Sequence, residues 1–357
     1  MCTIHPKCGA CLYSTATYNN IWKTKINTAI KNLKPFVSNN VPIIMHPKDV
    51  LHYRKKILLH VKSAIIPPKI GLIQKSDIVN IDLCPLQPEA INKKIDIIKY
   101  SLPQYDKFPL QYISFNNETV ILVLKDHHSH LARYLDTTKA IFSNVDFPYL
   151  YLHLNPSTGN KIFLKSYIYP VYGDLFLKDA DGYWYHPLVF QQQIHSLHIE
   201  SLQIAIDFLK GIDNFLDLYC GIGIASSIAI KYFKNIYGIE HLAISIECAK
   251  KNANKARFFV GQVDNRMSAL VKKEPDFFEN YVMYTNPPRS GMGKQCIKEI
   301  LKSPPSKIAY LSCNTKSLKN DLMLFNENYN INAIHFFDFF PYTNHIETLV
   351  LMSKECR

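Results

Sequence analysis

Short β-rich runs alternate with helical runs from about Asp217 to the end of the chain, and this alternation limits the possible folds more than any other feature. The predicted strands cover residues 214–219, 235–240, 256–260, 281–286, 307–312, 333–339 and 346–353. Helical composition lies between them, at 225–233, 243–254, 294–301 and 317–326. Strands that are joined by helices form a doubly wound α/β sheet, so we expect a Rossmann-like domain here. The last two strands leave no room for a helix between them, and they predict an antiparallel pair at the edge of the sheet.

The first half of the chain has a different pattern, in which apolar and polar residues alternate between prolines and polar turns. Such runs lie at 56–63, 120–125 and 161–168, and they predict an antiparallel β-domain. An amphipathic helix is expected before it, at 18–33, because apolar residues recur there at helical spacing. We place the boundary near residue 190, which gives an N-terminal β-rich domain at 1–190 and an α/β domain at 191–357.

The charge balance of the chain favours a polyanionic partner. Lysine and arginine outnumber aspartate and glutamate by 41 to 29, and the net charge of +12 suits nucleic acid or an acidic membrane surface. No run approaches the ~18 apolar residues of a membrane span, and the first residues lack the apolar segment of a secretion signal. We therefore expect a soluble cytoplasmic protein without membrane attachment, and we see no sign of an obligate protein partner.

A turn with two glycines, DLYCGIGI at 217–224, ends the first strand of the predicted α/β domain and begins a helix. The glycines let the backbone pass close to a ligand at the carboxyl edge of the sheet. A dinucleotide fits less well, because the third glycine of that fingerprint is missing and Asp217 would repel a pyrophosphate. Glu240 ends the second strand, where a carboxylate can accept both ribose hydroxyls of an adenosyl group. This spacing suits S-adenosylmethionine, and the simpler alternative is a plain glycine turn with a surface glutamate.

Cys313 follows the strand predicted at 307–312, at the same edge of the sheet. Most buried cysteines are inert, but a cysteine at a strand's carboxyl end beside polar Ser312 and Asn314 is a candidate nucleophile. Glu347 lies at the head of the last strand. It is either a partly buried base or a charge that discourages edge-to-edge strand pairing, and taken alone the second interpretation is the simpler one.

A third motif, Asn286-Pro-Pro-Arg289, follows another strand. The prolines restrict the backbone and thereby hold the asparagine amide in a fixed orientation. Enzymes that methylate adenine or glutamine amino groups also carry Asn-Pro-Pro, but they need an aromatic residue next. Here Arg289 follows, which suits a phosphate or a carboxylate, and that alternative would also leave Cys313 without a role.

With these motifs the chain resembles the RNA uracil-5-methyltransferase family, over essentially its whole length and in the family's order. The motifs are DLYCGIGI at 217–224, NPPRSGMG at 286–293, YLSCN at 310–314, FPYTNHIE at 340–347 and HPLVFQQQ at 186–193, the last being similar to a degraded Phe-Gln-x-Asn segment. Asn286 in place of the more common Asp, and the lack of an N-terminal RNA-binding barrel, resemble the branch that methylates one uridine of 23S ribosomal RNA. The resemblance therefore implies 23S rRNA as the partner, with tRNA as the alternative.

The resemblance also implies a role for each matching residue. Its implied contacts to S-adenosylmethionine come from Gln191, Tyr219, Glu240 and Asn286, its nucleophile is Cys313 and its base is Glu347. The basic segment YRKK at 53–56 is similar to the RNA-contacting patch of the β-domain. Gln193, where the family usually has Asn, and Ile224, where relatives are often small or polar, depart from the pattern and leave the edges of the cofactor pocket open.

The implied reaction explains why both catalytic residues are needed, since carbon 5 of uracil is a weak nucleophile. Addition of the Cys313 thiolate at carbon 6 forms an enolate, carbon 5 takes the methyl group, and Glu347 removes the carbon 5 proton. The uridine must leave its stack, at a cost of a few kcal/mol that contacts between basic residues and the RNA backbone offset. A non-catalytic RNA-binding factor is an alternative of another class, and the presence of both Cys313 and Glu347 argues against it.

Cys2, Cys8 and Cys11 lie together near the N-terminus, and Cys84 follows before a proline. Structural disulfides are rare in the cytosol, so metal binding or catalysis is the better interpretation. Four thiolates can hold zinc or an iron–sulfur cluster, and the spacing does not decide between them. The resemblance favours a four-iron four-sulfur (4Fe-4S) cluster with a structural role, tying the N-terminal segment to the β-domain.

Overall fold

The computed structural model describes residues 2, 4–37, 40–63, 65–103, 107–157, 159, 161–163 and 167–355. The chain forms two compact units that alternate along the sequence. The β unit comprises Met1–Thr15, Val50–Asp179 and His186–Gln193, and the α/β unit comprises Ala16–Asp49, Ala180–Tyr185 and Ile194–Arg357. The division expected at 1–190 and 191–357 thus lies close to the end of the β unit, but Ala16–Asp49 belongs with the α/β unit instead.

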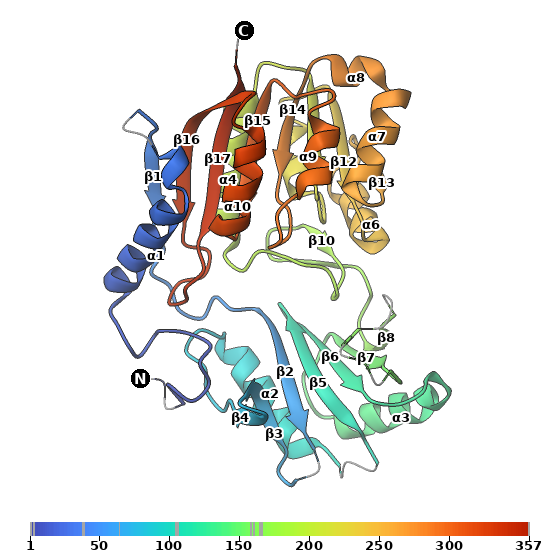
Figure 1. Ribbon diagram of the computed structural model, residues 1–357. Coiled ribbons are helices and arrows are strands. Elements are labelled where there is room, and N and C mark those ends of the chain that lie inside the picture. Colours follow the sequence, from blue (N-terminus) through green and yellow to red (C-terminus); the bar gives the residue numbers. More distant parts are fainter. Residues whose placement is uncertain are drawn as a thin grey trace. The chain divides into compact units, whose positions relative to one another are not determined.

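An eight-stranded sheet in the order β1-β16-β17-β15-β14-β11-β12-β13 lies at the centre of the α/β unit (Figure 1). Its strands are β1 (Ile43–His46), β11 (Asn214–Leu218), β12 (Asn235–Glu240), β13 (Arg257–Val260), β14 (Tyr281–Thr285), β15 (Lys307–Ser312), β16 (Tyr329–Phe337) and β17 (Glu347–Lys354). β17 runs antiparallel to both of its neighbours, β15 and β16, which confirms the expected antiparallel pair. The expected edge position of that pair is wrong, because β1 from the start of the chain runs parallel to β16 on its outer side.

Helices cover both faces of this sheet. On one face α1 (Tyr18–Asn32), α7 (Val263–Lys273), α8 (Pro275–Glu279), α9 (Lys294–Ile300) and α10 (Thr315–Phe325) share one apolar core with the strands. α4 (His195–Leu209), α5 (Ile224–Ala229) and α6 (Ala243–Asn252) pack against the sheet and against one another. Leu216 and Leu218 of β11 enter the first core, and Asp217 between them accepts a hydrogen bond from Ser226 of α5, so α5 lies on the opposite face. The unit is a three-layer α/β domain of the kind expected.

The amphipathic helix expected at 18–33 is α1, which begins after Thr17 and ends at Asn32. The Thr17 hydroxyl accepts a hydrogen bond from the backbone N–H of Asn20 at 3.4 Å and caps the helix. Its apolar side chains, among them Trp22 and Ile26, are buried in the core of the α/β unit. A 3₁₀ turn at Lys34–Phe36 then leads towards β1.

The β unit is built on a seven-stranded sheet in the order β4-β3-β2-β5-β6-β7-β8. Its strands are β2 (Lys56–Lys62), β3 (Lys69–Gln74), β4 (Asp77–Asn80), β5 (Leu110–Asn116), β6 (Thr119–Leu124), β7 (Leu150–Leu154) and β8 (Tyr169–Tyr172), and its helices are α2 (Glu89–Ser101) and α3 (Leu131–Ile141). Every pair is antiparallel except β6 and β7, so the expected antiparallel domain is confirmed with one parallel pair. Residues 164–166 of the run expected at 161–168 lie outside the described residues.

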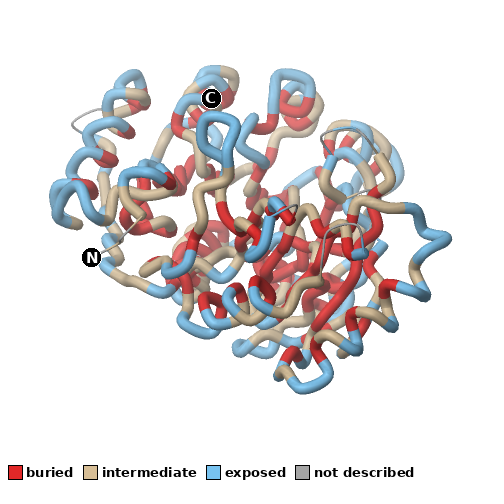
Figure 2. Tube along the Cα trace, turned by 90° about the horizontal axis from the view of Figure 1, so that it is seen from below, coloured by how far each residue is buried: buried red, intermediate tan, exposed pale blue. Residues whose placement is uncertain are grey.

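Three short elements complete the chain, namely a 3₁₀ turn at His128–His130, β9 (Leu177–Lys178) and β10 (Trp184–Tyr185). Figure 2 marks the buried residues in red, and every residue of β6 and β7 is buried. Within the part of the chain that the structure describes, no helix combines the length and the apolar character that crossing a membrane requires.

Candidate active site

The carboxyl ends of β11, β12, β14 and β15 meet at one edge of the α/β sheet, and antiparallel β17 begins there. This edge carries five of the residues singled out from the sequence, Tyr219, Glu240, Asn286, Cys313 and Glu347. The strand order reverses at β11, which has β12 on one side and β14 on the other. Open α/β sheets bind ligands at such a reversal, beyond the carboxyl ends of the strands.

The turn after β11 has the backbone geometry of a ligand-binding loop. Tyr219 has a φ of 58°, which is unusual for a residue other than glycine, and Gly223 has a φ of 78°. A Cβ at Gly223 would lie 2.9 Å from the Cβ of Ala249, so only glycine lets this turn approach α6 so closely. The Tyr219 hydroxyl donates to the Cys296 sulfur at 3.7 Å, which fixes the ring beside the turn.

Glu240 is held against the same turn. It is buried, its Oε2 accepts from the backbone N–H of Gly221 at 3.3 Å, and its Oε1 accepts from that of Leu242 at 3.0 Å. An ionised carboxylate has about four acceptor sites, so Oε2 keeps a lone pair for a further donor such as a ribose hydroxyl. The position and chemistry of Glu240 fit an adenosyl group.

Asp217 and Tyr284 are register partners on β11 and β14 and are both buried. Asp217 Oδ2 accepts from the Ser226 hydroxyl at 2.6 Å and from the Ser226 N–H at 3.2 Å, whereas Oδ1 has no partner among the described residues. Burial raises the pKa of Asp217 to about 7. The Tyr284 hydroxyl also has no described partner, and burial, Asp217 and Glu347 together raise its pKa. Polar groups without partners in this layer are typical of a functional site.

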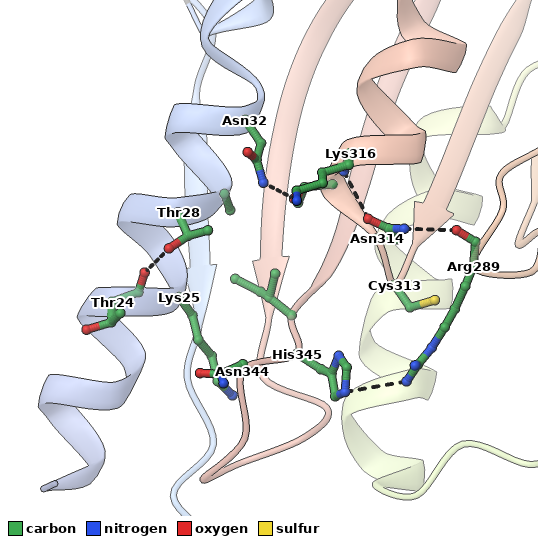
Figure 3. Close-up of a pocket in the computed structure, with 13 residues that line it drawn as sticks. Thr24, Lys25, Thr28, Asn32, Arg289, Cys313, Asn314, Lys316, Asn344 and His345 are labelled. Carbon is green, nitrogen blue, oxygen red and sulfur yellow. Dashed lines mark hydrogen bonds between the residues drawn. The ribbon is translucent and has the colours of Figure 1, made fainter. Parts of the chain in front are cut away.

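Cys313 is half-buried and its sulfur points toward the Arg289 side chain (Figure 3). Burial raises the pKa of the Cys313 thiol to about 11, and Glu347 adds to the rise, while the charge and a hydrogen bond of Arg289 oppose it. The Arg289 guanidinium lies 3.5 Å from Nε2 of His345. Arg289 is therefore the cation that can stabilise a thiolate at position 313.

Glu347 lies directly beyond the register pair Ser312 and Thr348, which places it beside Cys313 across the β15–β17 pair. Its side chain is only 2% exposed, and its Oε2 has no partner among the described residues. Burial raises the pKa of Glu347 to about 8, against the opposing charge of Arg289. Because β17 is an inner strand, the interpretation of Glu347 as an edge-strand charge is wrong, and a buried base fits the observed position.

The loop that carries Arg289 is fixed by a residue that the sequence analysis missed. Asp321 of α10 is buried and accepts from the Met292 N–H at 2.7 Å and from the Tyr310 hydroxyl at 2.6 Å. A Cβ at Gly291, whose φ is 81°, would lie 2.5 Å from Asp321 Oδ2. The carbonyl of Arg289 accepts from the Asn314 side chain at 3.0 Å, which ties the loop to the residue after Cys313. The sequence feature that could have identified Asp321 is an acidic residue between the apolar positions Leu318 and Leu322.

A pocket of about 470 Å³ opens beside Cys313. It is lined by Thr24, Lys25, Thr28, Ala29 and Asn32 of α1, by Arg289, by Cys313, Asn314, Thr315 and Lys316, and by Asn344, His345 and Ile346. Figure 3 shows α1 facing the Cys313 segment across this space. The wall formed by α1 was not predicted, because its residues lie more than 250 positions before the others.

Gln191 and the basic segment at 53–56 lie in the β unit. The Gln191 amide is buried, accepts from Asn117 at 2.8 Å and donates to Asp179 at 3.0 Å. Within the basic segment only Lys55 is exposed, while Lys56 donates to the carbonyl of Val189 at 2.6 Å and burial lowers its pKa to about 8. Most of this segment therefore points into the unit, and Lys55 is its residue available to a partner.

The four N-terminal cysteines, Cys2, Cys8, Cys11 and Cys84, line one small cavity of the β unit together with Arg54. Burial raises the pKa of the Cys11 and Cys84 thiols. Within the described ranges, no three histidine, cysteine, aspartate or glutamate side chains are close enough to hold a metal ion. The cavity thus collects the thiols that a cluster needs, but it does not arrange them as ligands.

Known proteins resemble the chain over most of its length. The sequence profile of the family described as tRNA (Uracil-5-)-methyltransferase matches residues 73–355. An uncharacterized RNA methyltransferase of Clostridium acetobutylicum is 26% identical, with 99% of this chain and 83% of the relative aligned. An uncharacterized RNA methyltransferase of Clostridium tetani is 27% identical, with 99% and 82% aligned.

The crystal structure of Pyrococcus abyssi tRNA (uracil-54, C5)-methyltransferase in complex with S-adenosyl-L-homocysteine has a similar fold. The TM-score is 0.73 and the sequence identity 23%, and the match covers 94% of this chain and 83% of that one. At this identity the likeness establishes the fold alone.

Proposed function

Since the chain belongs to the tRNA (uracil-5-)-methyltransferase family of S-adenosylmethionine-dependent RNA methyltransferases, we propose that it methylates carbon 5 of a uridine in 23S ribosomal RNA, in the cytoplasm, through a covalent bond to Cys313. The observation that carries this proposal is the position of Cys313 beside the buried Glu347, with Arg289 facing the sulfur. A uridine of tRNA is the alternative substrate, and the description of the family supports it. Both substrates require the same chemistry at the site.

The residues around the turn after β11 suit the cofactor. S-adenosylmethionine, when bound, supplies an electrophilic methyl group. Glu240 would accept a ribose hydroxyl, Tyr219 and Asn286 would border the adenosyl and methionyl parts, and Gln191 is the fourth proposed contact to the cofactor. The free lone pair of Glu240 and the close approach that Gly223 permits support this assignment.

In the proposed reaction the Cys313 thiolate forms a bond to carbon 6 of the uracil, and an electron pair moves onto the carbon 4 oxygen. Carbon 5 would then form its bond to the methyl group as the bond between that methyl group and the cofactor's sulfonium sulfur breaks. Glu347 would take the carbon 5 proton as the bond between carbon 6 and the Cys313 sulfur breaks. Arg289 stabilises the thiolate before addition and after release. A base with a pKa of about 8 suits this step, because its proton affinity is high while a fraction of it is still ionised near neutral pH.

We propose further that Cys2, Cys8, Cys11 and Cys84 hold a structural 4Fe-4S cluster, with zinc as the alternative. Their common cavity and their donor chemistry support this, because such clusters are held by four cysteine thiolates. Iron and sulfide in anaerobically purified protein would support the cluster, and stoichiometric zinc without iron would reject it.

The test of the main proposal is nucleoside mass spectrometry on 23S RNA and tRNA that lack 5-methyluridine, each incubated with the protein and S-adenosylmethionine. New 5-methyluridine in 23S RNA alone is the expected result, and methylation of tRNA alone would establish the alternative. The Cys313→Ala variant is expected to be inactive, and Glu347→Gln is expected to accumulate a protein–RNA adduct that resists denaturation. Wild-type turnover by Cys313→Ala would refute the covalent route.

A further inference from the structure

The pocket beside Cys313 extends well beyond the reacting residues, onto α1. Thr24, Thr28 and Asn32 are four residues apart, so their side chains form one row on the same side of the helix. Successive members of the row are about 6 Å apart along the helix axis. The row gives the pocket a second polar wall that the proposed reaction at carbon 5 does not use.

Hydrogen bonding makes the two threonines of this row acceptors. The Thr24 hydroxyl donates its hydrogen to the carbonyl of Asn20 at 2.8 Å, and the Thr28 hydroxyl donates to the carbonyl of Thr24 at 2.8 Å. A hydroxyl has one hydrogen and two lone pairs, so each oxygen can only accept from a ligand in the pocket. The Asn32 amide donates one of its two N–H groups to the Thr315 hydroxyl at 2.8 Å, so Asn32 is not limited to accepting. A ligand must therefore bring donors of its own to Thr24 and Thr28.

The other side of the pocket is cationic. Arg289 and Lys316 line it and are exposed, and no aspartate or glutamate is among the lining residues. Lys25 also lines the pocket, but its ammonium group is paired with Asp338 at 2.6 Å. The ligand that fits both sides has an anionic group for the cations and hydroxyl or amino donors for the row on α1.

A ribonucleotide has this distribution of groups, with a phosphate on one side and a 2′-hydroxyl on the other. We propose that α1 forms a subsite for the nucleotide adjoining the target uridine, in which the hydroxyl of either Thr24 or Thr28 accepts from the ribose 2′-hydroxyl while Lys316 holds the phosphate. This inference rests on the proposed function, because it assigns a neighbouring position in the same RNA. The subsite selects RNA over DNA, since only RNA carries the donor that the row requires.

The test uses the Thr24→Val/Thr28→Val double variant, in which valine keeps the shape of threonine and removes both acceptors. The substrates are two short oligonucleotides around the methylated uridine, one all-ribo and one with 2′-deoxyribose at the nucleotides on either side of the target. For the wild type, loss of the 2′-hydroxyls is expected to reduce kcat/KM about five- to tenfold, the worth of one or two hydrogen bonds. The double variant is expected to lose the same factor on the ribo substrate and nothing further on the deoxy substrate.

Asn27→Ala is the matched control, because Asn27 is exposed on α1 and does not line the pocket. It is expected to behave as the wild type with both substrates. An equal response of the wild type and the double variant to the deoxy substitution would overturn the proposal. Fluorescence anisotropy with the same oligonucleotides gives the same comparison without turnover. Dependence of binding on the 2′-hydroxyl without any methylation would therefore overturn the proposed function and leave the subsite standing.

Discussion

Two buried carboxylates lie at the two ends of the loop between β16 and β17, and only one of them is paired with a cation. Asp338, at the start of the loop, is fully buried and accepts from Lys25 at 2.6 Å. Glu347, at the end of the loop, is 2% exposed and makes no ion pair among the described residues. Each of the two carboxylates leaves one oxygen without a described partner, Oδ2 of Asp338 and Oε2 of Glu347. Burial raises the pKa of both groups, but only that of Asp338 is opposed by a cation within hydrogen-bonding distance.

The difference separates a structural carboxylate from a reactive one. Lys25 also donates to the carbonyl of Phe340 at 2.9 Å, so its pair with Asp338 anchors the loop to α1. A firmly paired carboxylate makes a poor base, because its partner stabilises the ionised form. Glu347 lacks such a partner and therefore has a high proton affinity, which destabilises the folded protein whenever the group ionises. The anchored end of the loop holds the unpaired end in place.

The largest expected effect is that of removing the Lys25 ammonium group from its pair with Asp338. Lys25→Met leaves Asp338 buried without its partner, and it is expected to lower the free energy of unfolding by about 3–5 kcal/mol. Urea denaturation measures this, with Lys23→Met as the control, because Lys23 is exposed on the same helix. The Lys25→Met/Asp338→Leu double variant is expected to recover most of the loss. Equal midpoints for Lys25→Met and the control would show that the pair contributes nothing.

The Glu347→Gln substitution should raise the stability of the fold, whereas Lys25→Met should lower it. The pKa of Glu347 is raised from 4.5 to about 8, so the fold favours the protonated form, and wild-type stability falls as the pH rises between these values. The variant lacks this loss, so it should be more stable than the wild type by on the order of 2–4 kcal/mol near pH 8, where about 1.4 kcal/mol corresponds to each unit of pKa. The two proteins should converge below about pH 4.5. A variant that is less stable at every pH would contradict an unpaired Glu347.

Asp217→Asn tests whether a second buried carboxylate also destabilises the folded protein when it ionises. Asp217 lies on β11, just before the turn with two glycines, and the expected effect is smaller. The pKa of Asp217 is about 7, against an ordinary value of 3.8, so its destabilising ionisation also sets in as the pH rises. The asparagine oxygen can still accept both hydrogen bonds from Ser226. Thermal unfolding near pH 8 should give a gain of about 1–3 kcal/mol that disappears below about pH 4. A loss of stability near pH 8 would mean that the ionised form has a partner at Oδ1.

The smallest expected effect concerns the influence of Glu347 on its neighbour. The Cys313 thiol has a pKa of about 11, raised by burial and by the charge of Glu347. The rate of alkylation of Cys313 by iodoacetamide, followed by peptide mass mapping, should rise with pH through that range. Glu347→Gln should move the profile to lower pH by less than about one unit, because burial is the larger cause. Arg289→Met should move the profile to higher pH, and a shift in the other direction would contradict its role beside the sulfur.

The site residues that could be predicted from the sequence are those whose positions depend on a neighbouring strand in the sequence. Cys313 and Asn286 each follow a strand that periodicity identifies, and Glu240 is the last residue of another. The strands at 235–240 and 307–312 have the predicted bounds. Parallel strands bring their carboxyl ends together, so local positions were sufficient to collect these residues at one edge.

The rest depends on single contacts between distant segments. The pairing of β1 with β16 and the Lys25–Asp338 ion pair leave no periodic signal, because each depends on residues whose neighbours are set by the tertiary fold. The polar row on α1 has helical spacing, but that spacing does not show which segment the row faces. The same reason explains why the pair of the last two strands was expected at the edge of the sheet, where β1 lies instead. It also explains why two contiguous domains were expected, whereas the two units alternate along the chain. The sequence also did not predict that Arg54 and Lys56 point into the β unit, because a run of basic residues does not show where their side chains point.

The pairing of the first helix with the last loop has a consequence for protein synthesis. Lys25 and Asp338 are 313 positions apart, so at roughly 5–20 residues per second Lys25 leaves the ribosome about 15 to 60 s before its partner. During that interval the apolar face of α1, with Trp22 and Ile26, has no sheet to cover it. The β unit is translated in between and can fold first. A nascent chain that stalls before β16 therefore carries an exposed apolar helix, which is the kind of segment that chaperones and quality-control proteases bind.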